Sequence, residues 1–255
     1  MNPLPAFSLH GRRALVTGAS TGIGAEILLT LADAGADVMV HHYQDAARAD
    51  AVATQARTRG VKAAVCEIDL GAPDAGSTVF RSAVAALGGV DILVLNASIQ
   101  ILDEWQGVTR ADFDRQVAVN LHSALEMLQV SVPAMTAQNW GRVLVIGSVQ
   151  QVVPRPNMIV YAATKCALGS FVINLAPLLA PHGVTINTLA PGTILTDRNA
   201  ARLADAAFAT RVVAGIPAGR IGAPRDCAGA ALLLCSEAGA YITGQTLYVD
   251  GGASL

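Results

Sequence analysis

The stretch "VTGASTGIGAE", from Val16 to Glu26, joins a short apolar run to a helical pattern and decides the fold. The residues "RALVTG" (13–18) are typical of a buried strand, and "GIGAEILLTLADAG" (22–35) has apolar residues at helical spacing. Glycines at positions 18, 22 and 24 lie between the two. Such a turn lets the backbone approach a phosphate, while the helix points N–H groups and partial positive charge at it. The stretch therefore predicts a dinucleotide-binding turn.

Strands and helices alternate from this turn to the end of the chain. Short continuous runs rich in Val, Ile and Leu are typical of strands covered on both faces of a parallel sheet. We therefore expect an α/β fold: one doubly wound Rossmann-type domain, residues 1–255, with a seven-stranded parallel sheet. The least regular segment, 193–222, follows a strand and is predicted to be a substrate loop. Beyond 13–18, the expected strands are 37–42, 62–70, 91–98, 141–148, 183–192 and 244–252.

The composition limits the kinds of partner. Only 14% of the 255 residues are charged, against about 25% in typical soluble domains, so we expect copies of the chain to cover part of its surface. The net charge of -2 and the lack of a basic block predict no binding to nucleic acid or to anionic membranes. No apolar run is expected to reach the roughly 18–20 residues of a membrane span, and the start lacks a signal-peptide pattern, so a cytoplasmic protein is expected. The cysteines lack metal-ligand spacing, and no metal site is predicted.

A second stretch, "SVQQVVPRPNMIVYAATK" (148–165), begins with a serine and ends with a tyrosine and a lysine four residues apart. On one helix, Tyr161 and Lys165 share a face. A cation about 4 Å from a phenol is worth about 4 kcal/mol at an effective dielectric near 20. That could lower the pKa of the phenol, ordinarily about 10, by up to about three units. By itself such a pair is usually structural, and a serine at a strand end usually caps a turn.

Several motifs together resemble the short-chain dehydrogenase/reductase family. "TGASTGIG" (17–24) is similar to its cofactor motif, and "LNAS" (95–98) to its Asn-Asn-Ala-Gly motif after strand four. "APG" (190–192) resembles its turn after strand six, and the likeness extends from about residue 8 to residue 252. The chain departs from the pattern at Leu95 and Ser98, where the family has Asn and Gly, so local cofactor contacts are expected to differ there.

The resemblance implies an NAD(P)-dependent oxidoreductase that transfers a hydride between nicotinamide and a carbonyl or secondary alcohol. Tyr161 is then the general acid/base, and Lys165 lowers its pKa and binds the nicotinamide ribose. Ser148 holds the substrate oxygen and stabilises developing charge. Asn120, within a helical pattern, holds a water that links Lys165 to solvent.

The resemblance also implies the cofactor site, and two positions bear on the choice of cofactor. NAD enzymes usually carry an acid at the end of strand two, where this chain has His41 and His42, which at a pKa of about 6.5 would favour a phosphate only partly. Thr21 stands where many NADP-preferring relatives have a basic residue. We expect NADP or dual use rather than strict NAD. The implied cofactor residues are Gly18, Ser20, Thr21, Gly22, Ile23, Gly24, His41, His42, Asp69, Leu70, Asn96, Ala97, Ser98, Tyr161, Lys165, Pro191, Gly192 and Ile194.

The substrate is less well defined by the sequence. Gln150, Gln151 and Met158 are candidate substrate residues, and amides that donate and accept suit a sugar, a polyol or a small polar ketone. The two glutamines could equally face solvent. The alternative substrate is a 3-oxoacyl thioester on a carrier protein, and a remote alternative is a non-catalytic dinucleotide-binding protein, which should have lost Tyr161 or Lys165. The resemblance further implies a homotetramer, with the helices after strands four and five at its main interface.

Overall fold

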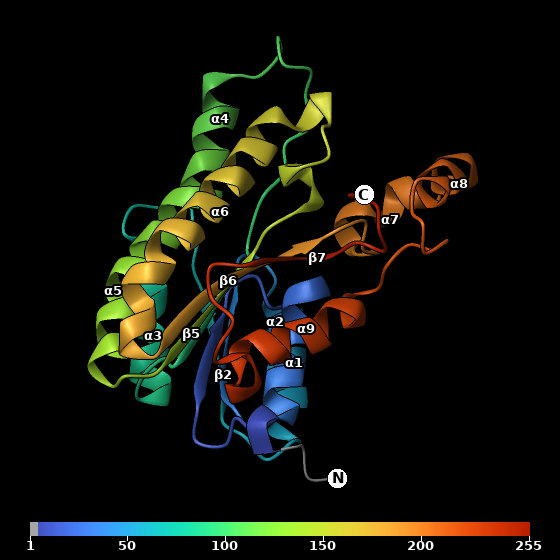
Figure 1. Cartoon of the computed structure of the whole chain (residues 1–255). Helices are drawn as coiled ribbons and strands as arrows, with labels where there is room; N and C mark the ends of the chain where they lie inside the picture. Colours follow the sequence, from blue (N-terminus) through green and yellow to red (C-terminus); the bar gives the residue numbers. More distant parts are fainter. Residues whose placement is uncertain (1–4) are drawn as a thin grey trace.

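One parallel sheet of seven strands forms the centre of the computed structural model, which describes residues 5–255 (Figure 1). The strand order is β3-β2-β1-β4-β5-β6-β7, so the predicted seven-stranded Rossmann-type sheet is confirmed. Every strand lies within its predicted range. The strands are β1 (Arg13–Val16), β2 (Asp37–His42), β3 (Ala63–Glu67), β4 (Ile92–Leu95), β5 (Gly141–Ile146), β6 (Val184–Pro191) and β7 (Thr246–Val249).

Helices cover both faces of the sheet. One face packs against α1, α2 and α9, and the other packs against α3, α5 and α6 (Figure 1). Two shorter helices, α7 and α8, project from the sheet at the right of Figure 1. The helices are α1 (Gly22–Asp33), α2 (Ala46–Arg57), α3 (Ala75–Leu87), α4 (Arg110–Val117), α5 (Ser123–Ala137), α6 (Ile159–Leu179), α7 (Asp197–Leu203), α8 (Ala206–Ala214) and α9 (Pro224–Cys235).

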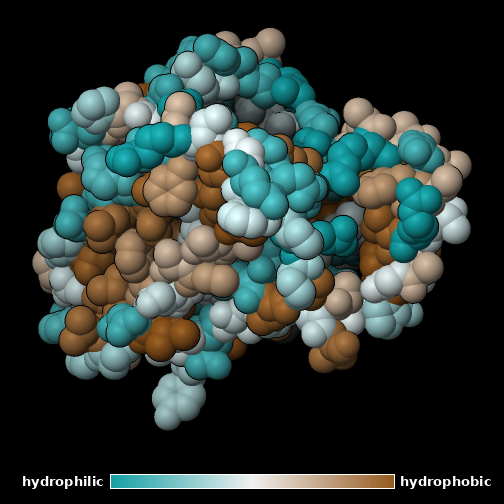
Figure 2. Space-filling model, turned by 90° about the horizontal axis from the view of Figure 1, so that it is seen from above, coloured by the Kyte–Doolittle hydropathy of each residue, from teal (hydrophilic) through white to brown (hydrophobic). Residues whose placement is uncertain are grey.

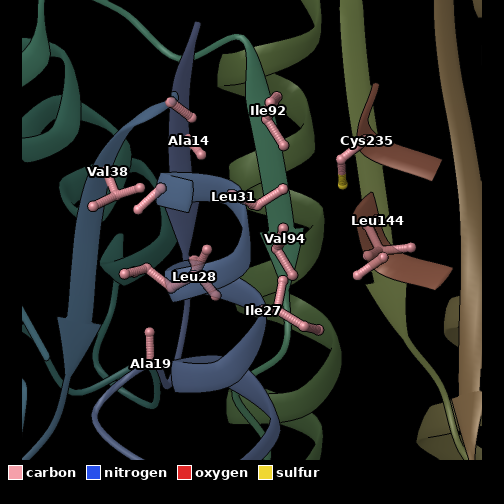
Figure 3. Close-up of a cluster of buried hydrophobic side chains, with 14 of the residues drawn as sticks. Ala14, Ala19, Ile27, Leu28, Leu31, Val38, Ile92, Val94, Leu144 and Cys235 are labelled. Atoms are coloured by element: carbon pink, nitrogen blue, oxygen red, sulfur yellow. The ribbon is translucent and has the colours of Figure 1, made fainter. Parts of the chain in front are cut away.

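Strands β1 to β6 each contribute to two hydrophobic cores, because successive side chains point to opposite faces of a sheet. In β1, Ala14 belongs to the core under α1, and Leu15 belongs to the core under α3, α5 and α6. Figure 3 shows Leu28 and Leu31 of α1 directed at the strands of the first core. This two-sided burial is the physical reason for the continuous apolar strands in the sequence.

Helix α6 is the most apolar long helix in the described part of the chain. The stretch Pro156–His182 is long and apolar enough to cross a membrane by length and composition alone, which differs from our expectation that no segment reaches that length. In the structure, α6 packs on the sheet through Leu168 and Val172. Of the most apolar 18-residue stretch in this segment, 44% is buried. Its composition is therefore that of a helix in the core of the fold.

The strand order reverses at β1, which has β2 on one side and β4 on the other. In open α/β sheets, ligands bind beyond the carboxyl ends of the strands at such a switch point. The glycine turn and the segments after β4, β5 and β6 all begin at that edge. Figure 2 shows a hollow between the body of the molecule and the lobe on its right, where α7 and α8 lie.

Candidate active site

A cavity of about 640 Å³ lies at the carboxyl edge of the sheet. Ser148, Tyr161 and Lys165 line it, as does the segment that follows β2 as far as Arg48. All the residues expected to bind the cofactor line the same cavity, together with Gln150 and Met158. Among the described residues, the sequence candidates that do not line it are Asn120 and Gln151. No group of three or more His, Cys, Asp or Glu within residues 5–255 is placed to hold a metal ion.

The glycine turn needs its glycines for two separate reasons. Gly18 and Gly22 have φ of +62° and +61°, in the left-handed region that side chains disfavour. Gly24 instead lies in close contact with the turn itself, and a Cβ there would clash with the carbonyl oxygen of Gly18 and with the side-chain amide of Asn96. The turn therefore leads closely into the N-terminus of α1, and both line the cavity, where the first N–H groups of a helix suit a phosphate.

Asn96, just after β4, holds this turn in place through its side-chain amide. Its Nδ2 donates to the carbonyl oxygens of Thr17, at 2.8 Å, and Gly18, at 2.9 Å. The two departures from the family pattern flank this amide. Leu95 is buried in the hydrophobic core, and the carbonyl oxygen of Ser98 accepts a 2.5 Å hydrogen bond from Arg198. Neither departure interrupts the contacts between Asn96 and the turn.

His41 is buried and supports the turn from the side of β2. Its Nδ1 accepts from the backbone N–H of Gly18 at 3.1 Å, so its Nε2 donates to the carbonyl oxygen of Ile68 at 2.9 Å. Burial lowers the pKa of His41 to about 4. The ring is therefore neutral near pH 7, and the expectation that its charge would partly favour a phosphate is wrong for His41. His42 is also buried, and its Nδ1 accepts from the N–H of Asp45 at 3.3 Å.

Helix α6 places Tyr161 and Lys165 on one face, as expected for residues four apart. Both are buried, and the Lys165 ammonium nitrogen lies 5.6 Å from the centroid of the Tyr161 ring. Lys165 donates to the carbonyl oxygen of Ile146 at 2.7 Å. Burial, with a smaller repulsion from Arg198, lowers the pKa of Lys165 to about 7. The pair thus presents a phenol and a titratable amine at one part of the cavity.

Ser148 follows β5 and is oriented by its neighbours. Its backbone N–H donates to Gln151 Oε1 at 3.1 Å, and its hydroxyl oxygen accepts from the N–H of Gln150 at 3.2 Å. The hydroxyl hydrogen remains available to a ligand in the cavity. Gln151, predicted as a substrate residue, does not line the cavity, and its side-chain amide oxygen is occupied by the backbone N–H of Ser148.

Asn120 lies in a π-helical turn, Ala118–His122, between α4 and α5. Such turns often occur at functional sites. Its amide oxygen accepts from the N–H of Ile99 at 2.8 Å, and its amide nitrogen donates to the carbonyl oxygen of Ile99 and to Thr164. Thr164 precedes Lys165 on α6, so Asn120 connects the segment after β4 with helix α6.

Comparison with known proteins gives the same assignment as the motifs. A family model described as "Enoyl-(Acyl carrier protein) reductase" matches residues 18–254. The L-rhamnose 1-dehydrogenase (NAD(P)(+)) of Sphingomonas sp. (strain SKA58) is 34% identical over 245 residues, which cover 96% of each chain. The chain belongs to the short-chain dehydrogenase/reductase family.

Solved structures of short-chain dehydrogenase/reductase proteins are similar along the whole chain. The 3-oxoacyl (acyl-carrier-protein) reductase of Agrobacterium tumefaciens C58, with NADP bound, is 42% identical, with a TM-score of 0.93 and coverage of 97% of this chain and 96% of that one. The gluconate 5-dehydrogenase of Burkholderia cenocepacia J2315, in complex with NADP and tartrate, is 34% identical, with a TM-score of 0.90 and coverage of 98% and 97%.

One residue of this short-chain dehydrogenase/reductase site, Arg48, was not predicted from the sequence. Arg48 lines the cavity from the first turn of α2, although no arginine replaces the acid expected at the end of β2. Arg198 and Phe208, which lie in the predicted substrate loop, line the cavity from α7 and α8. The segment 193–222 is therefore adjacent to the cavity, with residues from Thr193 to Val212 in its lining.

Proposed function

We propose that this protein is an NAD(P)-dependent oxidoreductase that acts on a carbonyl or secondary alcohol of a sugar, a polyol or a small polar ketone, with Tyr161 as general acid/base. The observation that carries the proposal is the convergence of Ser148, Tyr161 and Lys165 on a cavity that the glycine turn also lines. A nicotinamide bound there would supply or accept the hydride. The hydride leaves charge on the substrate oxygen, and a proton donor must neutralise it.

The cavity has the groups that NAD or NADP requires. The N-terminus of α1 and the positive-φ glycines at 18 and 22 suit a pyrophosphate. Asp69 lines the cavity and is held by Arg115 at 2.8 Å, which suits a contact with the adenine end. The relatives with NADP bound support the same cofactor class for this chain.

Each residue of the site has a separate role in the proposed reaction. The Tyr161 phenol gives its proton to the substrate oxygen or takes one from it. Ser148 donates its hydroxyl hydrogen to that same oxygen, and the N–H of Gln150 orients the hydroxyl by donating to its oxygen. Lys165 lies beside the phenol, where its charge stabilises the phenolate, and Asn120 joins the helix of Lys165 to the segment after β4.

Gln150 supports a hydroxylated substrate. It lines the cavity, and its buried Oε1 has no hydrogen-bond partner within residues 5–255. A buried acceptor without a partner costs about 1–3 kcal/mol, which a donor from the substrate would recover. A sugar or polyol hydroxyl supplies such a donor.

The alternative substrate is a 3-oxoacyl thioester on a carrier protein, which the similarity to the Agrobacterium reductase supports. A panel of sugars, aldonates, polyols and 3-oxoacyl thioesters, assayed with both cofactors by nicotinamide absorbance, separates the two. Turnover of hydroxylated substrates, with weak or no turnover of thioesters, is the result we expect. Efficient turnover of thioesters alone would replace the proposed substrate class by the alternative.

We further propose that the protein is a homotetramer. Helix α6 exposes two large apolar side chains, Ile173 at 63% and Leu178 at 66%, on the helix that the family resemblance places at the main interface. Burying them against a second copy would remove apolar surface from water. Light scattering at micromolar concentration should give the tetramer mass, and Ile173→Glu should reduce it. A monomer for the unmodified chain would contradict this assembly.

A further inference from the structure

Arg48 is held by two carboxylates in the wall of the cavity. Its Nε donates to both oxygens of Asp45, at 2.8 and 3.0 Å, and its Nη1 pairs with the Oδ2 atom of Asp197. The hydroxyl of Thr21 donates to the same Oδ2 atom at 3.1 Å. One oxygen of Asp197 is therefore coordinated by a cation and by a hydroxyl at the N-terminus of α1.

The arrangement has the composition of an anion site that the protein's own carboxylate fills. Thr21 is the N-cap residue of α1, yet its side chain makes no capping bond within the helix and points its hydroxyl to Asp197 instead. The side chain of Asp197 is 62% exposed and begins α7, in the segment 193–222. An exposed carboxylate at a helix start can turn away to solvent at small cost, because exposed ion pairs contribute little.

The position of this cluster relates it to the adenosine ribose. In Rossmann-type sheets the ribose 2′ position lies beside the end of the second strand. Arg48 follows that strand closely, in the first turn of α2. Because Asp45 holds the Nε edge, the terminal nitrogens of Arg48 are the ones available to a phosphate, whose oxygens match the guanidinium fork.

On the basis of the proposed function, we propose that Arg48 and Thr21 bind the 2′-phosphate of NADP, and that Asp197 occupies this place until the phosphate displaces it. Asp45 stays beside the site as a negative charge and limits the gain in affinity. The site therefore favours NADP while still admitting NAD.

The displacement also affects the segment over the cavity. Asp197 ties the start of α7 to Thr21 and Arg48, while its neighbour Arg198 ties it to the carbonyl oxygen of Ser98. A bound 2′-phosphate replaces the contacts of Asp197 with Thr21 and Arg48 and leaves the hydrogen bond from Arg198 to Ser98 intact. NADP and NAD thus leave this segment attached to the rest of the protein in different ways.

The test measures binding by calorimetry, with 2′-phospho-ADP-ribose and ADP-ribose as probes that carry the same pyrophosphate and no nicotinamide. Arg48→Gln should weaken the binding of 2′-phospho-ADP-ribose about tenfold, since it removes a charge-assisted contact. The affinity for ADP-ribose should not change. Asp197→Asn should tighten the binding of 2′-phospho-ADP-ribose severalfold, because it removes the carboxylate charge that competes with the phosphate. Arg57→Gln, on the same helix but away from the cavity, is the matched control and should change neither. Ionic strength is held constant, because exposed charges are screened by salt.

The possible failures are distinguishable. Equal weakening of both probes by Arg48→Gln, or no effect on either, would overturn the assignment of the phosphate site. Weaker binding of 2′-phospho-ADP-ribose to Asp197→Asn would overturn the role of Asp197 as a competitor. Failure of the unmodified protein to bind either probe would overturn the proposed function, and this inference with it.

Discussion

The ammonium group of Lys165 donates a 2.7 Å hydrogen bond to the carbonyl oxygen of Ile146, the last residue of β5. The contact fixes helix α6 to the strand that leads into Ser148, so the three catalytic candidates are held as a unit. Lys165 is only 2% exposed and pairs with no carboxylate in the described part of the chain. Its charge is therefore governed mainly by burial.

This burial should appear in the pH dependence of stability. The pKa of Lys165 is lowered to about 7 in the folded protein, from about 10.5. Between these values the unfolded chain binds more protons than the folded chain, so the free energy of unfolding should rise with pH. The slope contributed by this group is at most about 1.4 kcal/mol for each pH unit.

The measurement compares the unmodified protein with Lys165→Met by chemical denaturation from pH 7 to 10. The difference in unfolding free energy should shift in favour of the unmodified protein as pH rises. Lys62→Met, at an exposed position, serves as the control and should show no such trend. Parallel profiles for the protein and Lys165→Met would contradict a lowered pKa.

The glycine turn offers a pair of matched substitutions. Gly24→Ala should abolish cofactor binding or weaken it by orders of magnitude, and lower the melting temperature, because its Cβ would clash with the backbone of Gly18. Gly229→Ala lies on helix α9, where no atom outside the helix is near the added Cβ. It should preserve cofactor binding and raise the free energy of unfolding by about 0.5–1 kcal/mol. Thermal unfolding and cofactor titration test both variants. Unchanged binding in Gly24→Ala would rule out close packing as the reason for that glycine.

The neighbouring glutamines should behave differently in kinetics. Gln150→Leu should raise KM for hydroxylated substrates about tenfold and leave the KM for cofactor unchanged, because it removes the unpartnered Oε1 acceptor. Gln151→Leu should instead lower kcat, because it releases the backbone of Ser148. Steady-state kinetics with the best substrate of the panel measures KM and kcat for both variants. Identical effects of the two variants would contradict these separate roles.

The features that depend on local sequence could be predicted. Strands such as β4 (Ile92–Leu95) are continuous apolar runs in the sequence, and the glycine spacing around Gly22 placed the first turn. The pair Tyr161 and Lys165 needed only the helical repeat to share a face. These signals are local, since a few neighbouring residues determine each of them.

The remaining features depend on contacts between distant segments. Arg48 meets Asp197 only because the fold brings α2 beside the start of α7, and no spacing in the sequence encodes that contact. The neutrality of His41 arises mainly from burial by segments that are distant in the sequence, and this burial outweighs the opposing effect of the Ile68 carbonyl on its pKa. Gln151 was expected to contact the substrate because it follows Ser148, but the turn after β5 directs its amide to the backbone of that serine.

The most direct test of the account is the turnover of Tyr161→Phe, measured with the best substrate of the panel beside the affinity of the variant for the cofactor. The account predicts that kcat falls by about 10²–10⁴, the usual contribution of a general acid/base, while the dissociation constant for the cofactor stays within about twofold. Substantial turnover by the variant, with the same cofactor affinity, would contradict the assignment of Tyr161 as the proton donor.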